Sequence, residues 1–229
     1  RLVLCDRKNR KLKLFDKCFQ FVSHLKMDWS MGWSPSYLCR VDEGTVAVTL
    51  LTDIKLVSVT NKLTPLRSIY VGSLCLGIAS YQQNIIIAMK GYSLLTYDAS
   101  DKIINRIKLY DKLDEHNTLC VSQDGQRIYY TTKNAVVTMD MKGNKLNTFE
   151  GNELECASGI TADKQGIVYC CGKKSKSVIQ LTPEGRQLGA LLLHDHRLEN
   201  PHGICLNDRN DTILLFEENS NDVKVFRIC

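Results

Sequence analysis

The chain has 229 residues, of which 44% are hydrophobic and 24% are charged, and this ordinary globular composition excludes an intrinsically disordered chain. No apolar run approaches the ~20 residues of a membrane-spanning helix, so no membrane partner is expected. The net charge of +5 permits a nucleic acid or an acidic protein as partner and requires neither.

The stretch Arg1–Asp16 contains a unit that the rest of the chain repeats. An apolar run over Leu2–Cys5 ends at Asp6, four polar residues suited to a turn follow, and Lys11–Phe15 alternates polar and apolar side chains. This pattern predicts two short strands joined by a tight loop. Similar strand ends recur at Phe15, Ser58, Tyr97, Met139, Leu181 and Phe226, which are 43, 39, 42, 42 and 45 residues apart. A steady period near ~42 residues with about four strands per period is typical of a β-propeller.

We therefore predict one all-β domain over residues 1–229, a six-bladed β-propeller of four-stranded antiparallel blades. Each blade has strands a, b, c and d from centre to rim. The expected strands are Leu2–Cys5, Lys11–Phe15, Phe19–Val22, Ser36–Val41, Thr45–Leu50, Ile54–Val59, Ser68–Val71, Leu76–Ser80, Asn84–Ala88, Ser93–Tyr97, Ile103–Leu109, Thr118–Ser122, Arg127–Thr132, Ala135–Met139, Lys145–Phe149, Ser158–Ala162, Ile167–Cys171, Ser177–Leu181, Gln187–Leu192, Gly203–Leu206, Thr212–Phe216 and Asp222–Ile228. The first blade lacks strand a and the last lacks strand d, so we expect residues before Arg1 to supply the missing strands.

The ten cysteines do not form a recognisable metal or disulfide pattern. No Cys-x-x-Cys pair is present, and Cys39 and Cys120 stand where other repeats have isoleucine. A cysteine in place of isoleucine behaves as a small core side chain. We expect free thiols, more than half of them buried, in a reducing compartment, with a disulfide framework as the alternative.

Several segments match one family of propeller repeats. Asn200-Pro201-His202-Gly203-Ile204 opens the last blade, and the first blade combines Cys5-Asp6-Arg7-Lys8-Asn9-Arg10 with Leu14-Phe15-Asp16. This pattern resembles the NHL repeat, as found at the C-terminus of tripartite-motif proteins. The resemblance implies zinc-binding RING and B-box modules and a coiled coil upstream, oligomerisation through that coiled coil, a cytoplasmic location, and recognition of a partner or ubiquitination substrate for a ubiquitin ligase or scaffold.

The expected binding surface is formed by the b–c and d–a loops, which share one edge of every blade. Its candidate residues are Arg7, Lys8, Arg10, Lys11, Trp29, Trp33, Lys90, Lys133, Lys173, Lys174, Lys176 and His202. Basic side chains beside aromatic rings can bind single-stranded RNA, as some NHL propellers do. Acidic residues at Glu217, Glu218 and Asp222 interrupt this basic field. We therefore expect a protein partner, with RNA as the alternative.

Metal binding and catalysis are the remaining possibilities. His194, His196 and His202 could hold a metal if their loop folded tightly, but the family element already accounts for Pro201-His202-Gly203. Lactonase-type six-bladed propellers place carboxylates around calcium in the central tunnel. The residues that start strand a here include no carboxylate, and no nucleophile elbow or phosphate loop is present. We expect no metal, no cofactor and a non-catalytic propeller, with a lactonase-type hydrolase as the less favoured alternative.

Overall fold

The computed structural model describes residues 1–27, 37–113, 117–192 and 198–228. Over these ranges the chain forms 22 β-strands in six sheets, with one 3-10 helix at Asn152–Leu154. The six antiparallel sheets are the blades of a β-propeller, which confirms the predicted fold class. The chain divides into two compact units, Arg1–Arg106 and Ile107–Cys229.

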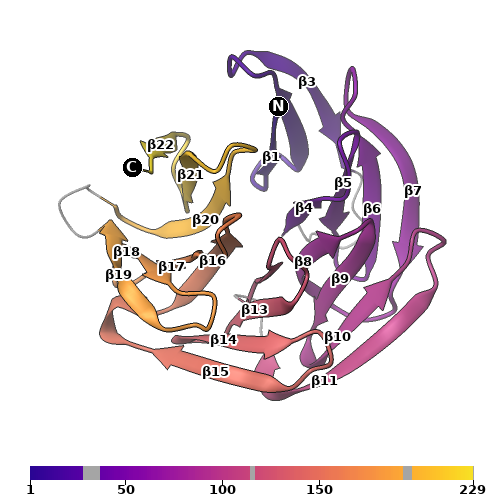
Figure 1. Cartoon of the computed structure of the whole chain (residues 1–229). Helices are drawn as coiled ribbons and strands as arrows, with labels where there is room; N and C mark the ends of the chain where they lie inside the picture. The colour runs from indigo at the N-terminus through magenta and orange to yellow at the C-terminus, as the bar shows by residue number, and fades with distance from the viewer. Residues whose placement is uncertain (28–36, 114–116, 193–197, 229) are drawn as a thin grey trace. The chain divides into compact units, whose positions relative to one another are not determined.

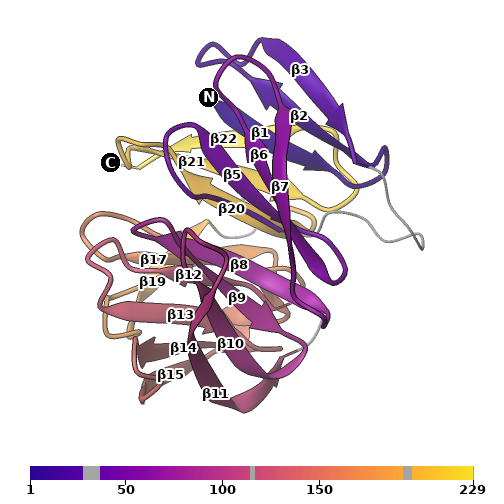
Figure 2. The same cartoon turned by 90° about the vertical axis from the view of Figure 1, so that its right-hand side faces the viewer.

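The first unit contains two whole sheets and most of a third. The first sheet has three strands, β1 (Leu2–Asp6), β2 (Lys11–Phe15) and β3 (Phe21–Lys26). The second has four, β4 (Leu38–Arg40), β5 (Thr45–Thr49), β6 (Asp53–Ser58) and β7 (Thr64–Tyr70). The third also has four, which lie side by side in both views (Figures 1 and 2): β8 (Cys75–Tyr81), β9 (Asn84–Met89), β10 (Gly91–Tyr97) and β11 (Ile103–Leu113).

The second unit begins within β11 and contains three further sheets. The fourth sheet has β12 (Leu119–Val121), β13 (Arg127–Thr131), β14 (Ala135–Asp140) and β15 (Lys145–Glu150). The fifth has β16 (Ala157–Ala162), β17 (Val168–Gly172), β18 (Ser177–Leu181) and β19 (Gln187–Leu192). The sixth has three strands, β20 (Pro201–Leu206), β21 (Thr212–Glu217) and β22 (Val223–Arg227).

Each predicted strand has a counterpart, and three outermost strands differ clearly from the expected bounds. The strand expected at Phe19–Val22 lies at Phe21–Lys26, because the preceding turn continues through Gln20. The strand β7 starts at Thr64 and includes Pro65. An outermost strand tolerates proline because one of its edges needs no hydrogen-bond donor. The strand β11 continues to Leu113, four residues beyond the expected Leu109.

Recurring aspartates cap the turns that follow strand c. Asp16 Oδ1 accepts hydrogen bonds from the backbone N–H groups of Cys18 and Gln20, at 2.8 and 2.9 Å, and Asp98 and Asp140 make the equivalent pairs of bonds. The third residue after each cap has a left-handed backbone, with φ of 60° at Phe19, 62° at Asp101, 96° at Gly143 and 79° at Gly185, where Thr182 replaces the aspartate. The aspartates that suggested a family motif therefore have a structural role in these turns.

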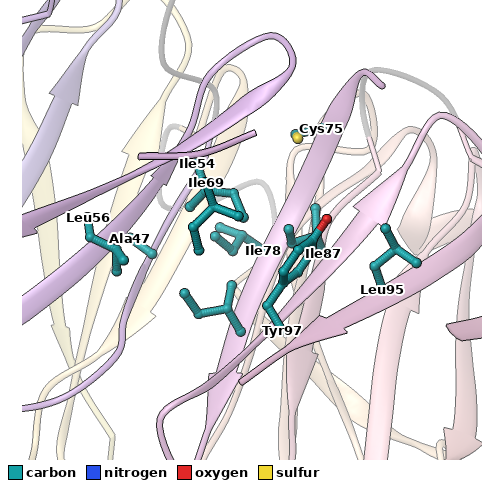
Figure 3. Close-up of a cluster of buried hydrophobic side chains, with 10 residues drawn as sticks. Ala47, Ile54, Leu56, Ile69, Cys75, Ile78, Ile87, Leu95 and Tyr97 are labelled. Carbon is teal, nitrogen blue, oxygen red and sulfur yellow. The ribbon is translucent and has the colours of Figure 1, made fainter. Parts of the chain in front are cut away.

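The hydrophobic core lies between neighbouring sheets. The second and third sheets pack through one cluster (Figure 3), which includes Ala47, Ile54, Leu56, Ile69, Cys75, Ile78, Ile87, Leu95 and Tyr97. Comparable clusters join the first sheet to the second, the fourth to the fifth and the fifth to the sixth. The strand β9 is apolar from Ile85 to Met89 because both of its faces are covered, and each buried isoleucine contributes about 1.5–3 kcal/mol.

A repeated outer-strand contact joins a sheet to the next one along the chain. Arg67 on β7 binds the capped turn after β10: its Nε lies 2.9 Å and its Nη2 3.0 Å from the Asp101 carboxylate, and Nη2 also donates to the Ala99 carbonyl at 3.0 Å. The equivalent contacts are Ser23 Oγ with the Leu63 N–H at 3.0 Å, Ile107 against Gly143, and Asn147 Nδ2 with the Gly185 carbonyl at 2.8 Å. The contacting residues of the outer strands are thus 44, 40 and 40 positions apart, close to the repeat period.

The inner strands β16 and β20 approach each other at Gly159. A Cβ atom at this position would lie 2.7 Å from the His202 carbonyl oxygen and 2.9 Å from Gly203 Cα. Both are backbone atoms of a neighbouring strand, so they cannot move aside as a flexible side chain could. Thr118 and Ser158 reinforce this packing, because Thr118 Oγ1 donates to the Ser158 carbonyl at 2.9 Å and Ser158 Oγ donates to the Pro201 carbonyl at 3.0 Å.

We predict that Gly159→Ala destabilises the protein by about 2 kcal/mol or more, because overpacking against fixed backbone forces strands apart. The matched control is Gly189→Ala on β19, where a Cβ would meet no atom within 4 Å. The control should change stability by less than about 0.5 kcal/mol. Urea denaturation of both variants measures the difference, and equal stabilities would contradict the close approach.

The nine described cysteines are all free. Cys39 lies in β4 and Cys120 in β12, the innermost strands of their sheets, as predicted. The expectation that more than half are buried is wrong, because three are buried, five are partly exposed and Cys18 is exposed. Burial raises the pKa of the thiols of Cys5, Cys39, Cys75 and Cys205 to about 12.

We predict that Cys18 is alkylated first when the folded protein is treated with iodoacetamide at neutral pH. The thiolate is the reactive form, and Cys18 is the exposed cysteine among those that the structure describes. Cys75, Cys170 and Cys171 should react only after unfolding, because they are buried and burial raises their pKa. Peptide mass spectrometry over time measures the order, with Cys18→Ser as the control. Rapid labelling of Cys170 in the folded state would contradict this assignment.

Candidate functional site

In the second unit, a d–a connection is held between two b–c turns. The Gly151–Cys156 connection follows β15, and the backbone N–H groups of Lys173 and Lys174 donate to its Cys156 and Glu155 carbonyls, each at 3.0 Å. Ser175 Oγ donates to the Glu153 carbonyl at 2.8 Å. On the other side, Asn134 Oδ1 accepts the Cys156 N–H at 3.1 Å, and the Lys133 carbonyl accepts the Ala157 N–H at 3.0 Å. These bonds fix three loops of neighbouring sheets against each other.

The lysines of these loops alternate with acidic side chains. Lys173 forms an ion pair with Glu218 from the turn between β21 and β22, and Lys174 Nζ lies 3.7 Å from Glu155 Oε1. Lys133 and Lys176 are exposed in the same two b–c turns. We call the set Lys133, Glu155, Lys173, Lys174, Lys176 and Glu218 the mixed-charge loop surface. Acidic side chains therefore interrupt the lysines of this surface.

Glu217 anchors the last turn of the same region. Its carboxylate lies 2.6 Å from Lys224 Nζ and accepts the Glu199 backbone N–H at 2.6 Å. Partial burial alone would raise the pKa of Glu217, but the hydrogen bonds from Lys224 and from the Glu199 N–H outweigh it and lower that pKa. The Asn200 carbonyl accepts the Glu218 N–H at 2.9 Å, so the acidic turn is fixed to the segment that precedes β20.

In the first unit, the predicted basic residues are divided between two turns. Arg7, Lys8 and Arg10 are exposed in the turn between β1 and β2, and Lys11 follows as the first residue of β2. Lys90 lies in the turn between β9 and β10, where its N–H donates to the Leu74 carbonyl at 3.0 Å. The structure therefore groups four of the predicted residues on the first sheet and places the fifth two sheets away.

Asp6 and Asn9 shape the turn that carries the arginines. Asp6 Oδ1 accepts the backbone N–H of Asn9 at 3.0 Å and its side-chain amide at 3.1 Å, while Asp6 Oδ2 lies 2.6 Å from Lys13 Nζ. Partial burial alone would raise the pKa of Asp6, but the hydrogen bonds from Lys13 and Asn9 outweigh it and lower that pKa to about 2. The Asp–Asn pair that resembles the NHL repeat therefore fixes the conformation of the turn.

The positive charge of the chain is unevenly distributed, which the motif pattern did not predict. Residues 1–27 contain eight Lys and Arg and two Asp, which gives a net charge of +6, whereas the other residues contain 22 basic and 23 acidic residues, a net −1. The first sheet and its loops therefore carry the whole basic excess of the chain. A count of charge for each predicted blade would have found this signal.

Four of the residues expected at a binding or metal site are not described by the structure. Trp29, Trp33, His194 and His196 lie outside the described residues. His202 is described: it is the second residue of β20 and is partly exposed. Within the described ranges, no group of three or more His, Cys, Asp or Glu side chains is arranged to hold a metal ion. Over the same ranges, no helix is long and apolar enough to cross a membrane.

Comparison with known proteins shows similarity of fold alone. The chain matches no family model and no curated protein. Among solved structures, a streptogramin B lyase superposes with a TM-score of 0.72 over 99% of this chain and 79% of its own, at 14% identity. Virginiamycin B lyase from Staphylococcus aureus gives 0.70 over 97% and 78%, at 13% identity. A protein of unknown function from Bacteroides caccae gives 0.75 over 96% and 83%, at 11% identity.

These neighbours correct one expectation. The absence of a familiar catalytic motif led us to expect a non-catalytic propeller, and that expectation is wrong, because the same fold is found in two lyases. A propeller can place reactive side chains on any of its loops, so motifs taken from other enzyme folds do not test it. The neighbours support the propeller fold. They do not show the NHL repeat or a tripartite-motif context.

We predict that Asp6→Asn destabilises the folded protein at pH 7 and has little effect near pH 2. A lowered pKa in the folded state means that the carboxylate stabilises the fold above its unfolded pKa of ~3.9. This contribution is lost as the pH falls through the folded pKa of about 2. Urea denaturation of the wild type and the variant at both pH values measures the difference. Glu43→Gln, in an exposed turn, is the control, and a difference that persists at pH 2 would contradict the assignment.

Proposed function

We propose that this chain is a protein-recognition module that binds a partner or substrate protein through the mixed-charge loop surface. The supporting observation is the pairing of Lys173 with Glu218 and of Lys174 with Glu155 across loops that backbone hydrogen bonds hold together. A surface held in this way loses little conformational entropy when a partner binds. Alternating charges also suit a protein surface, where complementary charges determine specificity and orientation.

RNA binding through these loops is the alternative. Binding to a phosphate backbone requires basic side chains whose counterions can be released. Here Glu218 and Glu155 already neutralise Lys173 and Lys174, and a phosphate chain crossing them would pass two carboxylates. The loop surface of the second unit therefore favours a protein partner over a nucleic acid.

The resemblance of the first and last blades to NHL repeats supports a more specific role. In that role the propeller would recognise substrates for a ubiquitin ligase or partners of a scaffold, as in tripartite-motif proteins. The motif residues themselves do not decide this, because Asp6, Asn9 and Asp16 are occupied in turns. The discriminating observation is the sequence of the full-length protein, since a ligase would need a RING module beside this chain.

We predict that Lys174→Glu lowers the affinity for the partner about tenfold or more, because a reversed charge repels the matching partner charge. Affinity capture with the wild-type chain, followed by quantitative mass spectrometry, identifies proteins whose capture depends on this residue. Lys142→Glu is the control, because Lys142 is exposed in the c–d turn at the opposite edge of the fourth sheet.

The double variant Lys174→Glu/Glu155→Lys separates the pair from its surroundings. It keeps the net charge and the ion pair but exchanges the two signs. Binding of a partner that recognises the charge pattern should therefore still be lost. If both surface variants capture the same proteins as Lys142→Glu, the loop surface is not the binding site. If instead they lose tight binding to an RNA oligomer, the function is nucleic-acid binding.

A further inference from the structure

We propose that the first sheet binds an acidic, extended segment of a partner protein along β3. The proposal rests on the proposed function of protein recognition and adds the chemistry of the bound segment. It uses residues 1–27, all of which the structure describes. We call the surface formed by Lys11, Lys13, Phe15, Phe21, His24 and Lys26 the β3 face.

The strand register gathers positive charge on this face. Lys11 is opposite Lys26 and Lys13 is opposite His24 in the antiparallel pair of β2 and β3. Like charges directly opposite each other, as those of Lys11 and Lys26 are, destabilise a sheet. A position where local stability is sacrificed in this way often serves a function. An anionic ligand would convert this repulsion into attraction.

Within the described residues, the acids of the first sheet neutralise one of these charges, that of Lys13. Asp6 is held by Lys13 and Asn9, and Asp16 Oδ1 accepts the N–H groups of Cys18 and Gln20. Among the residues that the structure describes, Lys13 is the one basic side chain of this sheet with a carboxylate within ion-pair distance. Lys26 and the turn residues Arg7, Lys8 and Arg10 are exposed. Positive charge therefore remains available at the end of the sheet where Lys26 lies opposite Lys11, next to the turn between β1 and β2.

The geometry of β3 suits an added strand. In the described structure β3 pairs with β2 on one side only and is the last strand of its sheet. Its outward residues Phe21, Val22, His24 and Lys26 are exposed, whereas Leu12 and Leu14 on the other face of the sheet are buried against the second sheet. An extended peptide can hydrogen-bond to such an edge, and its alternate side chains, about 6.6 Å apart, then match alternate residues of the strand.

The aromatic residues favour a peptide over a nucleic acid. The Phe21 ring stacks on His24, with centroids 6.3 Å apart and an interplanar angle of 27°, and it meets Phe15 edge-on at 6.0 Å. A nucleic-acid base would need an open ring face for stacking. One face of Phe21 is already covered by His24, so the ring is less suited to stacking with a base. The expected segment therefore carries acidic residues at alternate positions, which share the face of His24 and Lys26.

The test uses the full chain and a fluorescent peptide, Glu-Val-Glu-Val-Glu-Val, of six residues, the length of β3. We expect salt-sensitive binding that Lys26→Glu weakens about tenfold. The same substitution should raise the melting temperature, because it replaces a like-charge pair with an attractive one. This opposite effect on binding and stability would not come from a merely structural residue. The control is Lys102→Glu, an exposed turn residue that gives the same change of net charge.

Two further ligands separate the alternatives. The peptide methylated on alternate backbone nitrogens keeps its charges but cannot pair with a strand edge, so its binding should be lost. Equal weakening by Lys26→Glu and Lys102→Glu, or full binding of the methylated peptide, would overturn the proposal. Tighter binding of oligouridine than of the peptide, weakened by Lys26→Glu, would overturn it in favour of a nucleic acid. Lys174→Glu should leave peptide binding unchanged, so a failure of the loop surface is distinguishable from a failure here.

Discussion

The outer-strand contact is the constraint on which the repeat depends. A sheet can bury both faces only when the next sheet docks on it, and docking brings each capped turn against the preceding outer strand. Arg67 with Asp101 and Asn147 with Gly185 make this contact at equivalent positions. The turn must present its backbone at a fixed place, which requires a capping side chain and a left-handed residue three positions later. The recurring Asp and Gly residues thus follow from packing between sheets.

The opposite edge of the sheets is free of this requirement. The b–c turns and d–a connections need to close their strands, but their side chains do not have to dock a neighbouring blade. In the second unit these loops still hold one another through backbone bonds, as between Lys173 and Cys156, and through the side chains of Asn134 and Ser175. Backbone bonds leave the side chains variable, so a charge pattern can change without loss of the fold. This separation of stability from recognition explains why one fold includes lyases as well as the recognition module proposed for this chain.

The sequence predicted the strands well because alternation and turn residues are local signals. It was less successful at outer strands such as β3, where the cap at Asp16 moves the start of the strand and only the folded turn reveals it. The candidate surface was harder to predict, because Lys173 and Glu218 are 45 residues apart and their pairing depends on how two sheets align. The expectation of a non-catalytic propeller failed for a different reason: an absent motif says little about a fold whose loops vary independently.

The distribution of charge shows where the chain departs from what stability alone would require. In the second unit, the loop residues Lys173 and Lys174 have the acidic partners Glu218 and Glu155, and the chain beyond residue 27 is nearly neutral as a whole. The first sheet instead places Lys11 opposite Lys26 and uses its two aspartates to hold turns. Burial of Leu12 and Leu14 against the second sheet stabilises this arrangement despite the repulsion. A sheet whose hydrophobic face supplies its stability can carry unpaired charge on the other face, and that charge is available to bind an acidic partner.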